Sequence, residues 1–536
     1  MEKFLTHLLR KDNWLIGYDI NQFNSLTQQL FQQLQNYETP PKILLIENNP
    51  FFFLAAFLAA TATNSEIFLC NPNWVESEWE QVFALVQPDL IFSNNLPTFI
   101  SLTLKNASNI NYVNLNNIYP LNPVIFNQPK SSEASPEINN LPNSPLPNHL
   151  ILNETKSNQA FLNLHLNQSQ KPQTNKLDTT SRTEDFPTKI MIPTGGTSGK
   201  IRFAIHTWST LTASVTGFFH YFEAKPVNSF CILPLYHVSG LMQFLRSLIT
   251  NGKILILPYK TFKATIYENR LSSHNSIFNL LEIQDYFISL VPTQLQFILE
   301  KNPAWLAKFK TVLLGGAPAW EALLVTARKQ NIKLAPTYGM TETASQIITL
   351  KPNDFLAGNS SSGKTLPHAQ VLIYSDEHQI LPPNKIGKIA INTASLCLGY
   401  YPQISQNHKY FLTDDLGFFD NQGYLNIVGR SSKKIITGGE NVFPSEVEAA
   451  ILATNLITDV CVIGLLDKTW GQVVCAIYVP KNTQISETEI KTALNRKLSK
   501  YKQPKKWITV TNLPRNPQGK INYQQIKKIA LSNTNL

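Results

Sequence analysis

Three consecutive segments between residues 309 and 339 constrain the fold more than any other part of the sequence. FKTVLLGG and IKLAPTYG have the apolar character of buried strands, and PAWEALLVTARKQ between them has the pattern of a helix. Because the connections are short, the helix returns the chain to a neighbouring parallel strand. These segments predict an α/β fold built on a parallel sheet.

The length of the chain and a change of pattern after residue 429 predict two domains. A chain of 536 residues exceeds one ordinary core. Before that point apolar runs such as KILLIE, FLAAFLAATAT and DLIFS alternate with polar segments. After it come two strand-like runs, DVCVIGLL and QVVCAIYVP, and two helix-like runs, ETEIKTALNRKLSKY and INYQQIKKIALS. We expect a large N-terminal domain of parallel-rich sheets layered with helices (1–430) and a small, mobile α+β C-terminal domain (431–536).

A segment rich in Asn, Ser, Pro and Gln, at about residues 127–187, interrupts the N-terminal domain. Its composition is typical of a loop-like or partly disordered insertion. Two runs inside it, NHLILNE and AFLNLHLN, are candidates for short strands.

Composition excludes several function classes. No apolar run reaches the roughly 18 residues that span a bilayer, and the N-terminus lacks the pattern of a secretory signal. The five scattered cysteines show no metal-ligand spacing and suit a reduced cytoplasm. Of the net charge of +10, +8 lies after residue 430, with 15 Lys and Arg against 7 Asp and Glu. This charge does not form a basic stripe interleaved with aromatic residues, so a polyanionic small ligand or a plain basic face is favoured over nucleic acid.

The first motif with chemical content is TGGTSGK, residues 194–200. Glycines let a backbone approach an anion closely, hydroxyl and N–H groups donate to it, and Lys200 neutralises it. The motif is not a Walker A loop, which needs Gly where this chain has Thr194 and Ser or Thr where it has Ile201. The alternative is an ordinary turn between a strand and a helix expected at about residues 207–222.

The second motif is PTYGMTE, residues 336–342, at the carboxyl end of a predicted strand, where open α/β sheets bind ligands. Tyr338 could stack on a base, and Glu342 could hold Mg²⁺, which prefers carboxylate and phosphate oxygens. The alternative to ligand binding is a plain strand-to-helix turn with a capping threonine.

Two further motifs are weak alone. TDD, residues 413–415, is followed by Gly429 and Arg430, and acidic residues after a strand often bind ribose hydroxyls. PRNPQGK, residues 514–520, places Lys520 on a constrained loop that domain motion could bring to a distant site. Their alternatives are a surface aspartate, a structural arginine and an exposed lysine.

Together, in this order and spacing, the motifs resemble the acyl-adenylate-forming superfamily of acyl-CoA synthetases, adenylation domains and luciferases. TGGTSGK resembles its phosphate loop, YGMTE its adenylate-binding core, TDD and GR its ribose motifs, and NPQGK its adenylation lysine loop. The resemblance covers roughly residues 188–525. It implies that ATP and a carboxylate give an acyl-adenylate, that the small domain rotates, and that the thiol of coenzyme A attacks.

The resemblance also assigns roles to residues. The residues implied to contact the nucleotide are Thr194, Gly195, Gly196, Thr197, Ser198, Gly199, Lys200, Gly315, Gly316, Ala317, Tyr338, Gly339, Thr341, Asp415 and Arg430. Glu342 is implied to hold Mg²⁺, Lys520 to bridge the carboxylate and the nucleotide, and Gly438 and Gly439 to line the thiol path.

Within this superfamily, YGMTETASQ and GRSSKKIITGGENVFPSEVE resemble o-succinylbenzoate–CoA ligases of menaquinone and phylloquinone biosynthesis. The hinge residue, Asp in many relatives, is Ser432 here. Ile201 departs from the superfamily pattern, which has Pro after the phosphate-loop lysine.

The acyl pocket is predicted from LYHVSG, residues 235–240, whose histidine lines that pocket in the superfamily. The residues predicted to contact the acid are His237, Ser239, Gly240, Arg246 and Ser345. Because o-succinylbenzoate has a second carboxylate, which needs a partner when buried, we expect Arg246 to provide it. The alternative is a structural or surface arginine.

The sequence thus predicts a cytoplasmic ligase that uses ATP, Mg²⁺ and coenzyme A on a small carboxylate, with no nucleic acid partner and no membrane insertion. Alternative functions are another aryl- or fatty-acid–CoA ligase, a stand-alone adenylation enzyme for a carrier protein, and a non-catalytic binding protein. Retention of Glu342 and Lys520 argues against the last. The oligomeric state is left open, a homo-oligomer included.

Overall fold

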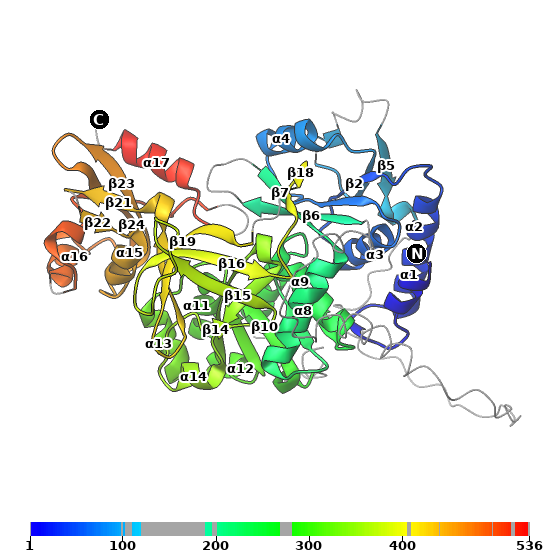
Figure 1. Ribbon diagram of the computed structural model, residues 1–536, viewed down its shortest axis with the longest axis horizontal. Helices are drawn as coiled ribbons and strands as arrows, with labels where there is room; N and C mark the ends of the chain where they lie inside the picture. Colours follow the sequence, from blue (N-terminus) through cyan, green and yellow to red (C-terminus); the bar gives the residue numbers. More distant parts are fainter. Residues whose placement is uncertain are drawn as a thin grey trace, which may run out of the picture.

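The structure is a computed structural model of the chain (Figure 1). It describes residues 2–97, 100–101, 110–118, 188–195, 201–267, 281–404, 409–438, 440–495, 497–515 and 520–533. The insertion predicted at about 127–187, with its two candidate strands, lies outside the described residues.

The first large sheet contains the predicted strand–helix–strand unit. Strands β11 (Thr311–Leu314) and β12 (Leu334–Met340) are parallel neighbours connected through α13 (Glu321–Lys329), as predicted. The eight strands follow the order β1-β9-β8-β10-β11-β12-β13-β14, and only the last two pairings are antiparallel. The bounds of the others are Leu15–Ile16 for β1, Asn228–Cys231 for β8, Ile254–Ile256 for β9, Tyr286–Leu290 for β10, Ser345–Thr349 for β13 and Lys364–Thr365 for β14.

The second large sheet follows the order β18-β17-β7-β6-β3-β2-β4-β5. Its strands are β2 (Lys42–Leu45), β3 (Glu66–Leu69), β4 (Leu90–Ser93), β5 (Asn111–Asn114), β6 (Lys189–Gly195), β7 (Ile201–His206), β17 (Gly399–Tyr400) and β18 (Gln403–Ile404). The sequence prediction missed β7, because it placed only the helix of about residues 207–222 after the Gly/Ser/Thr loop. That helix is confirmed as α8 (Trp208–Phe222). β6 and β7 are antiparallel, with Gly195 opposite Ile201, so this loop joins two strands.

A layer of apolar helices lies between the two large sheets. It contains α2 (Ile20–Gln35), α3 (Pro50–Thr61), α8 (Trp208–Phe222) and α9 (Val238–Ile249). One apolar core joins their side chains to both sheets, for example Ile67 of β3 and Ile254 of β9. Every residue of α3 is buried. Among the described residues no helix is long and apolar enough to cross a bilayer.

Further helices cover the outer faces of the two sheets. α4 (Glu76–Val86) packs on the second sheet, and α10 (Tyr259–Tyr267), α11 (Pro292–Lys301), α12 (Pro303–Leu306) and α13 pack on the first. Short helices α1 (Glu2–Leu8), α6 (Leu115–Ile118) and α14 (Pro352–Leu356) complete the described helices of this part.

A four-stranded antiparallel sheet then leads to a small C-terminal unit (Figure 1). The sheet contains β15 (Ala369–Tyr374), β16 (Gly387–Thr393), β19 (Phe411–Phe419) and β20 (Leu425–Arg430). The C-terminal unit contains β21 (Ile435–Thr437), β22 (Glu440–Val442), β23 (Ile457–Asp467), β24 (Gly471–Pro480), β25 (Lys506–Thr509), α15 (Pro444–Leu452), α16 (Glu487–Leu494) and α17 (Tyr523–Ser532).

The predicted class, an α/β N-terminal domain with a small α+β C-terminal domain, is confirmed. The two strand-like runs after residue 430 form the antiparallel pair β23–β24, and α16 is shorter than the helix predicted for ETEIKTALNRKLSKY. The exact boundary at 430/431 stays a prediction.

Candidate active site

The segment YGMTE lies in a tight connection between β12 and β13. β12 ends at Met340, a single 3-10 turn spans Thr341–Thr343, and β13 begins at Ser345. Ala344 and Ser345 have φ of 50° and 95°, a backbone region that residues other than glycine rarely adopt. Backbone strain of this kind concentrates at functional sites because the surrounding structure must hold it in place.

A buried histidine holds this connection from the other large sheet. His206, the last residue of β7, lies within 2.8 Å of the Thr341 carbonyl oxygen through Nε2 and 3.0 Å of the Thr210 hydroxyl through Nδ1. Because a carbonyl only accepts, Nε2 carries the proton. Burial lowers the pKa of His206 to about 4, so the ring is neutral at neutral pH. The β6–β7 strand pair is thereby tied to the YGMTE segment.

Glu342, in this turn, bonds to a tyrosine whose ring lies against an arginine. The Tyr400 hydroxyl donates to Glu342 Oε1 at 2.6 Å, and the Arg202 guanidinium lies 4.2 Å from the Tyr400 ring centre. In the described part of the chain no group of three or more His, Cys, Asp or Glu could hold a metal ion. A single carboxylate fits Mg²⁺ only if phosphate and water oxygens complete the shell, which is how Mg²⁺ is usually bound.

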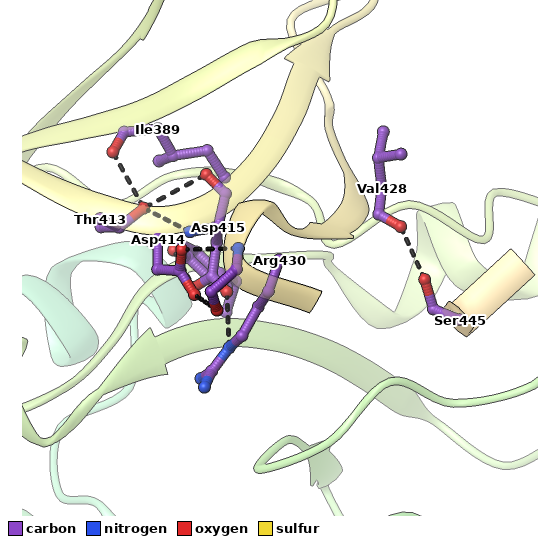
Figure 2. A network of polar contacts seen from close by, with 9 residues as sticks. Ile389, Thr413, Asp414, Asp415, Val428, Arg430 and Ser445 are labelled. Carbon is purple, nitrogen blue, oxygen red and sulfur yellow. Dashed lines mark hydrogen bonds and ion pairs between the residues drawn. The ribbon is translucent and has the colours of Figure 1, made fainter. Parts of the chain in front are cut away.

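Tyr338, Asp415 and Arg430 form one polar chain. The Tyr338 hydroxyl donates to Asp415 Oδ2 at 2.8 Å. Arg430 Nε donates to Asp415 Oδ1 at 3.1 Å (Figure 2). Figure 2 also shows Thr413, whose hydroxyl donates to the Ile389 carbonyl and accepts from the Asp415 N–H. Both oxygens of Asp415 are thus fixed, and the predicted TDD, GR and YGMTE motifs meet here.

The hinge residue Ser432 is held by the neighbouring carboxylate. Its backbone N–H donates to Asp414 Oδ1 at 3.0 Å, and its hydroxyl donates to Asp414 Oδ2. A second tie crosses the same junction, because the Ser445 hydroxyl of α15 donates to the Val428 carbonyl at 2.7 Å (Figure 2). These bonds attach the C-terminal unit to the strand pair that carries Asp415 and Arg430.

Lys520 belongs to the C-terminal unit and lies near enough to Arg430 and Glu342 for their charges to act on it. Burial, the largest cause, and the charge of Arg430 lower the pKa of Lys520, and Glu342 acts in the opposite direction. The charge of Lys520 also contributes to the lowered pKa of His237, about 3, although burial is the larger cause.

The segment LYHVSG forms the entry to α9. His237 is the residue before the helix, is half-buried, and has a shielded Nε2 atom that no described residue pairs. The Ser239 carbonyl accepts from the Gln243 side chain at 2.8 Å. A Cβ on Gly240 would lie 2.1 Å from the Pro234 carbonyl oxygen, so only glycine fits this turn.

Arg246, on the same helix, is a buried cation. Its Nη2 donates to the Ser345 hydroxyl at 3.0 Å and to Gln346 Oε1 at 2.8 Å, and its guanidinium lies 4.1 Å from the Phe218 ring centre. Burial lowers its pKa to about 9, which leaves it charged at neutral pH. No described carboxylate pairs with it, and Nε has no described partner. The structure thus brings two of the predicted acid contacts, Arg246 and Ser345, together.

The remaining predicted residues are partly described. Gly315, Gly316 and Ala317 follow β11, and a Cβ on Gly315 would lie 2.6 Å from the Thr337 hydroxyl. Thr194 is buried at the end of β6, and Gly438 (φ 58°) packs beside Trp470. Gly196, Thr197, Ser198, Gly199, Lys200 and Gly439 lie outside the described residues.

Several groups of this site have no signal in the sequence. Arg202, His206 and Tyr400 belong to no motif, and their partners are far away along the chain. A further histidine, His368, lies close enough to Arg246 for the arginine charge to lower its pKa, although burial, the larger cause, brings it to about 4.

Gly339 gives a test of the close β12–β13 approach. A Cβ on this residue would lie 2.1 Å from the Ser345 carbonyl, so Gly339→Ala should cost about 3 kcal/mol through overpacking. Gly423→Ala is the matched control: its φ is 79° but nothing lies within 4 Å, so only about 1 kcal/mol of backbone strain is expected. Calorimetric unfolding midpoints compare the two. A Gly339→Ala midpoint equal to that of the control would contradict the packing described.

Known protein families and relatives match most of this chain. The AMP-binding enzyme family matches residues 21–401, and its C-terminal domain matches residues 446–520. A 2-succinylbenzoate–CoA ligase of Oceanobacillus iheyensis is 35% identical over 343 residues, which are 62% of this chain and 68% of that protein. The corresponding ligase of Bacillus mycoides is 31% identical over 347 residues, 63% of this chain and 69% of its own.

Solved structures share the fold. The o-succinylbenzoate CoA synthetase of Bacillus subtilis, in complex with its acyl-adenylate intermediate, superimposes with a TM-score of 0.75 at 23% identity, over 98% of this chain and 97% of that one. The same synthetase with ATP and a magnesium ion gives a TM-score of 0.73 at 22% identity, over 98% and 99%. The family match spans more than half of the chain, and the resemblance deduced from the motifs is confirmed: the chain belongs to the AMP-binding enzyme family, the superfamily of adenylate-forming acid–thiol ligases.

Proposed function

We propose that this protein is an ATP-dependent ligase that converts 2-succinylbenzoate (o-succinylbenzoate) and coenzyme A to 2-succinylbenzoyl-CoA through an acyl-adenylate, releasing AMP and pyrophosphate. The observation that carries the choice of acid is the buried Arg246 cation, which no described carboxylate neutralises. An uncompensated buried charge is costly, so a second carboxylate of the substrate is a fitting partner. The two ligases compared above support the same acid.

In the first step the substrate carboxylate attacks the α-phosphate of ATP. Two anions must approach each other, so nearby cations lower the barrier. Lys520 is the residue proposed to lie between the carboxylate and the nucleotide, and the lowered pKa of His237 fits a neutral ring beside this cation. Glu342 would hold Mg²⁺, which when bound neutralises charge on the phosphates.

The nucleotide is proposed to bind between the YGMTE connection and the Asp415–Arg430 pair. Asp415 has both oxygens oriented by hydrogen bonds, so it can accept from ribose hydroxyls in a fixed geometry. Tyr338 offers its ring to the base while its hydroxyl remains bonded to Asp415. Thr194–Lys200 and residues 315–317 complete the proposed site, as the resemblance implies.

The second step requires the C-terminal unit to move. Lys520 and the Thr437–Gly439 segment belong to this unit, so rotation would replace the adenylation lysine by the proposed thiol path. The bonds between Asp414 and Ser432 lie at the pivot and must change during the rotation. The charge of +8 after residue 430, from 15 Lys and Arg against 7 Asp and Glu, suits the phosphates of coenzyme A.

A coupled assay with o-succinylbenzoate, ATP and coenzyme A tests the proposal. We expect AMP, pyrophosphate and the acyl-CoA in equal amounts. A panel of aryl and fatty acids in ATP–pyrophosphate exchange should show o-succinylbenzoate with the highest kcat/KM. Preference for an acid with one carboxylate would disprove the assigned substrate, and adenylate formation without transfer to coenzyme A would indicate another acceptor.

Arg246→Ala should raise the KM for o-succinylbenzoate by roughly 10- to 100-fold, because a charged hydrogen-bond partner of the second carboxylate is lost. The KM for ATP should change little. Arg246→Lys keeps the charge but not the forked geometry, so it should recover only part of the loss. Steady-state kinetics measure these values, and an unchanged KM for the acid in Arg246→Ala would exclude this role.

Lys520→Ala should slow adenylate formation by roughly 100-fold or more, because a cation that stabilises developing charge is removed. Thioester formation from supplied acyl-adenylate should be largely kept, since the lysine has rotated away. Lys528→Ala, an exposed lysine of α17, is the matched control. Single-turnover measurements separate the two steps, and equal loss of both would count against the two-state mechanism.

A further inference from the structure

His368 has an unusual polar environment for a histidine that belongs to no motif. It lies in the connection between β14 and β15, and the Thr393 hydroxyl donates to its backbone carbonyl at 3.0 Å. Both ring nitrogens are shielded from water, and neither finds a hydrogen-bond partner among the described residues. A polar atom left in this state is costly, so each such atom in a native structure calls for an explanation.

Helix α8 leaves room for this ring at a single glycine. A Cβ on Gly217 would lie 1.8 Å from His368 Nδ1, far inside any contact distance. Gly217 has helical backbone, so conformational freedom does not account for a glycine here. The space that the imidazole needs explains the glycine, although glycine weakens a helix relative to alanine.

The same helix packs against both His368 and Arg246. Phe218, the residue after Gly217, has its ring under the Arg246 guanidinium, and Ser214, one turn earlier, donates to the Ala344 carbonyl at 2.6 Å. Ala344 precedes Ser345 and Gln346, the two partners of Arg246. The Arg246 charge acts on the His368 ring as well.

Unpaired donors predominate in this cluster of buried polar groups. Arg246 Nε and Gln346 Nε2 have no described partner and can only donate, and a neutral His368 ring adds one N–H. Burial, the larger cause, and the charge of Arg246 lower the pKa of His368 to about 4, so its ring is neutral at neutral pH. A carboxylate can accept from several donors at once, which matches this set.

We propose that His368 is a specificity-determining residue. It donates a hydrogen bond, alongside Arg246, to the second carboxylate of the acid, which is the carboxylate that ATP does not activate. The inference rests on the proposed function and assigns a second recognition group to the same acid. Gly217 is a positioning residue, because it sets where the imidazole lies and has no side chain of its own to contact the acid.

The test compares two acids on each variant. One is o-succinylbenzoate, and the other is the analogue in which hydrogen replaces the non-activated carboxylate. His368→Asn should lower the ratio of kcat/KM for the diacid over the analogue about tenfold, because a hydrogen bond to a charged group is lost. His378→Asn is the matched control, since His378 is exposed and lies in a left-handed turn that asparagine tolerates. The control should leave the ratio unchanged.

Gly217→Ala gives an independent test without altering the imidazole itself. The added methyl group displaces the ring, so the same ratio should fall to a similar extent. In the double variant Gly217→Ala/His368→Asn the ratio should fall no further than in His368→Asn alone, because the ring that the methyl group displaces is absent. Thermal unfolding midpoints of all variants show whether folding is retained.

The outcomes separate this inference from the proposed function. A wild-type enzyme that activates o-succinylbenzoate, with a ratio unchanged in His368→Asn, would overturn the role of His368 and leave the proposed function standing. Equal loss on both acids, or additive effects of the two substitutions, would show a structural role and would also overturn it. A wild-type enzyme that does not activate o-succinylbenzoate would overturn the proposed function and this inference with it.

Discussion

The burial of one apolar helix layer between two eight-stranded sheets is the constraint on which the rest of the structure depends. The wholly buried helix Pro50–Thr61 packs between these sheets, and the core around it joins side chains of both. Because apolar burial is the dominant favourable term in folding, this layer fixes how the sheets face each other. Strand ends from different parts of the chain then meet at one place, where their polar residues can act together.

Polar contacts between the sheets turn this arrangement into a site. His206 at the end of one sheet bonds to the Thr341 carbonyl at the end of the other, and Arg246 of the helix layer bonds to Ser345 and Gln346. These groups are buried, so a lost partner would cost more than at the surface. The YGMTE connection, which carries two residues with positive φ, is held in its strained form by these neighbours.

The C-terminal unit is attached in a different way. Its own cores, around residues such as Val447 and Ile477, are separate from that of the helix layer. Hydrogen bonds at Asp414–Ser432 and Val428–Ser445 hold the junction, together with the charge of Lys520 near Glu342. Exposed polar contacts are weak compared with a buried apolar interface, which suits the rotation proposed for this unit.

The sequence by itself determined the α/β class, the parallel strands around Val312 and Leu334, and a smaller unit after residue 430, because hydrophobic periodicity and short connections are local properties. It also indicated the family, since the order of several motifs is preserved in a linear chain. Strand β7 was missed because its short apolar run precedes a helix without a clear break. Only the tertiary structure decided that His206 supports Thr341, that Arg246 is buried without a described carboxylate, and that His368 fills the space beside Gly217. Each of these contacts joins residues about 100 or more positions apart, and burial and electrostatic environment arise only when the folded chain brings such residues together.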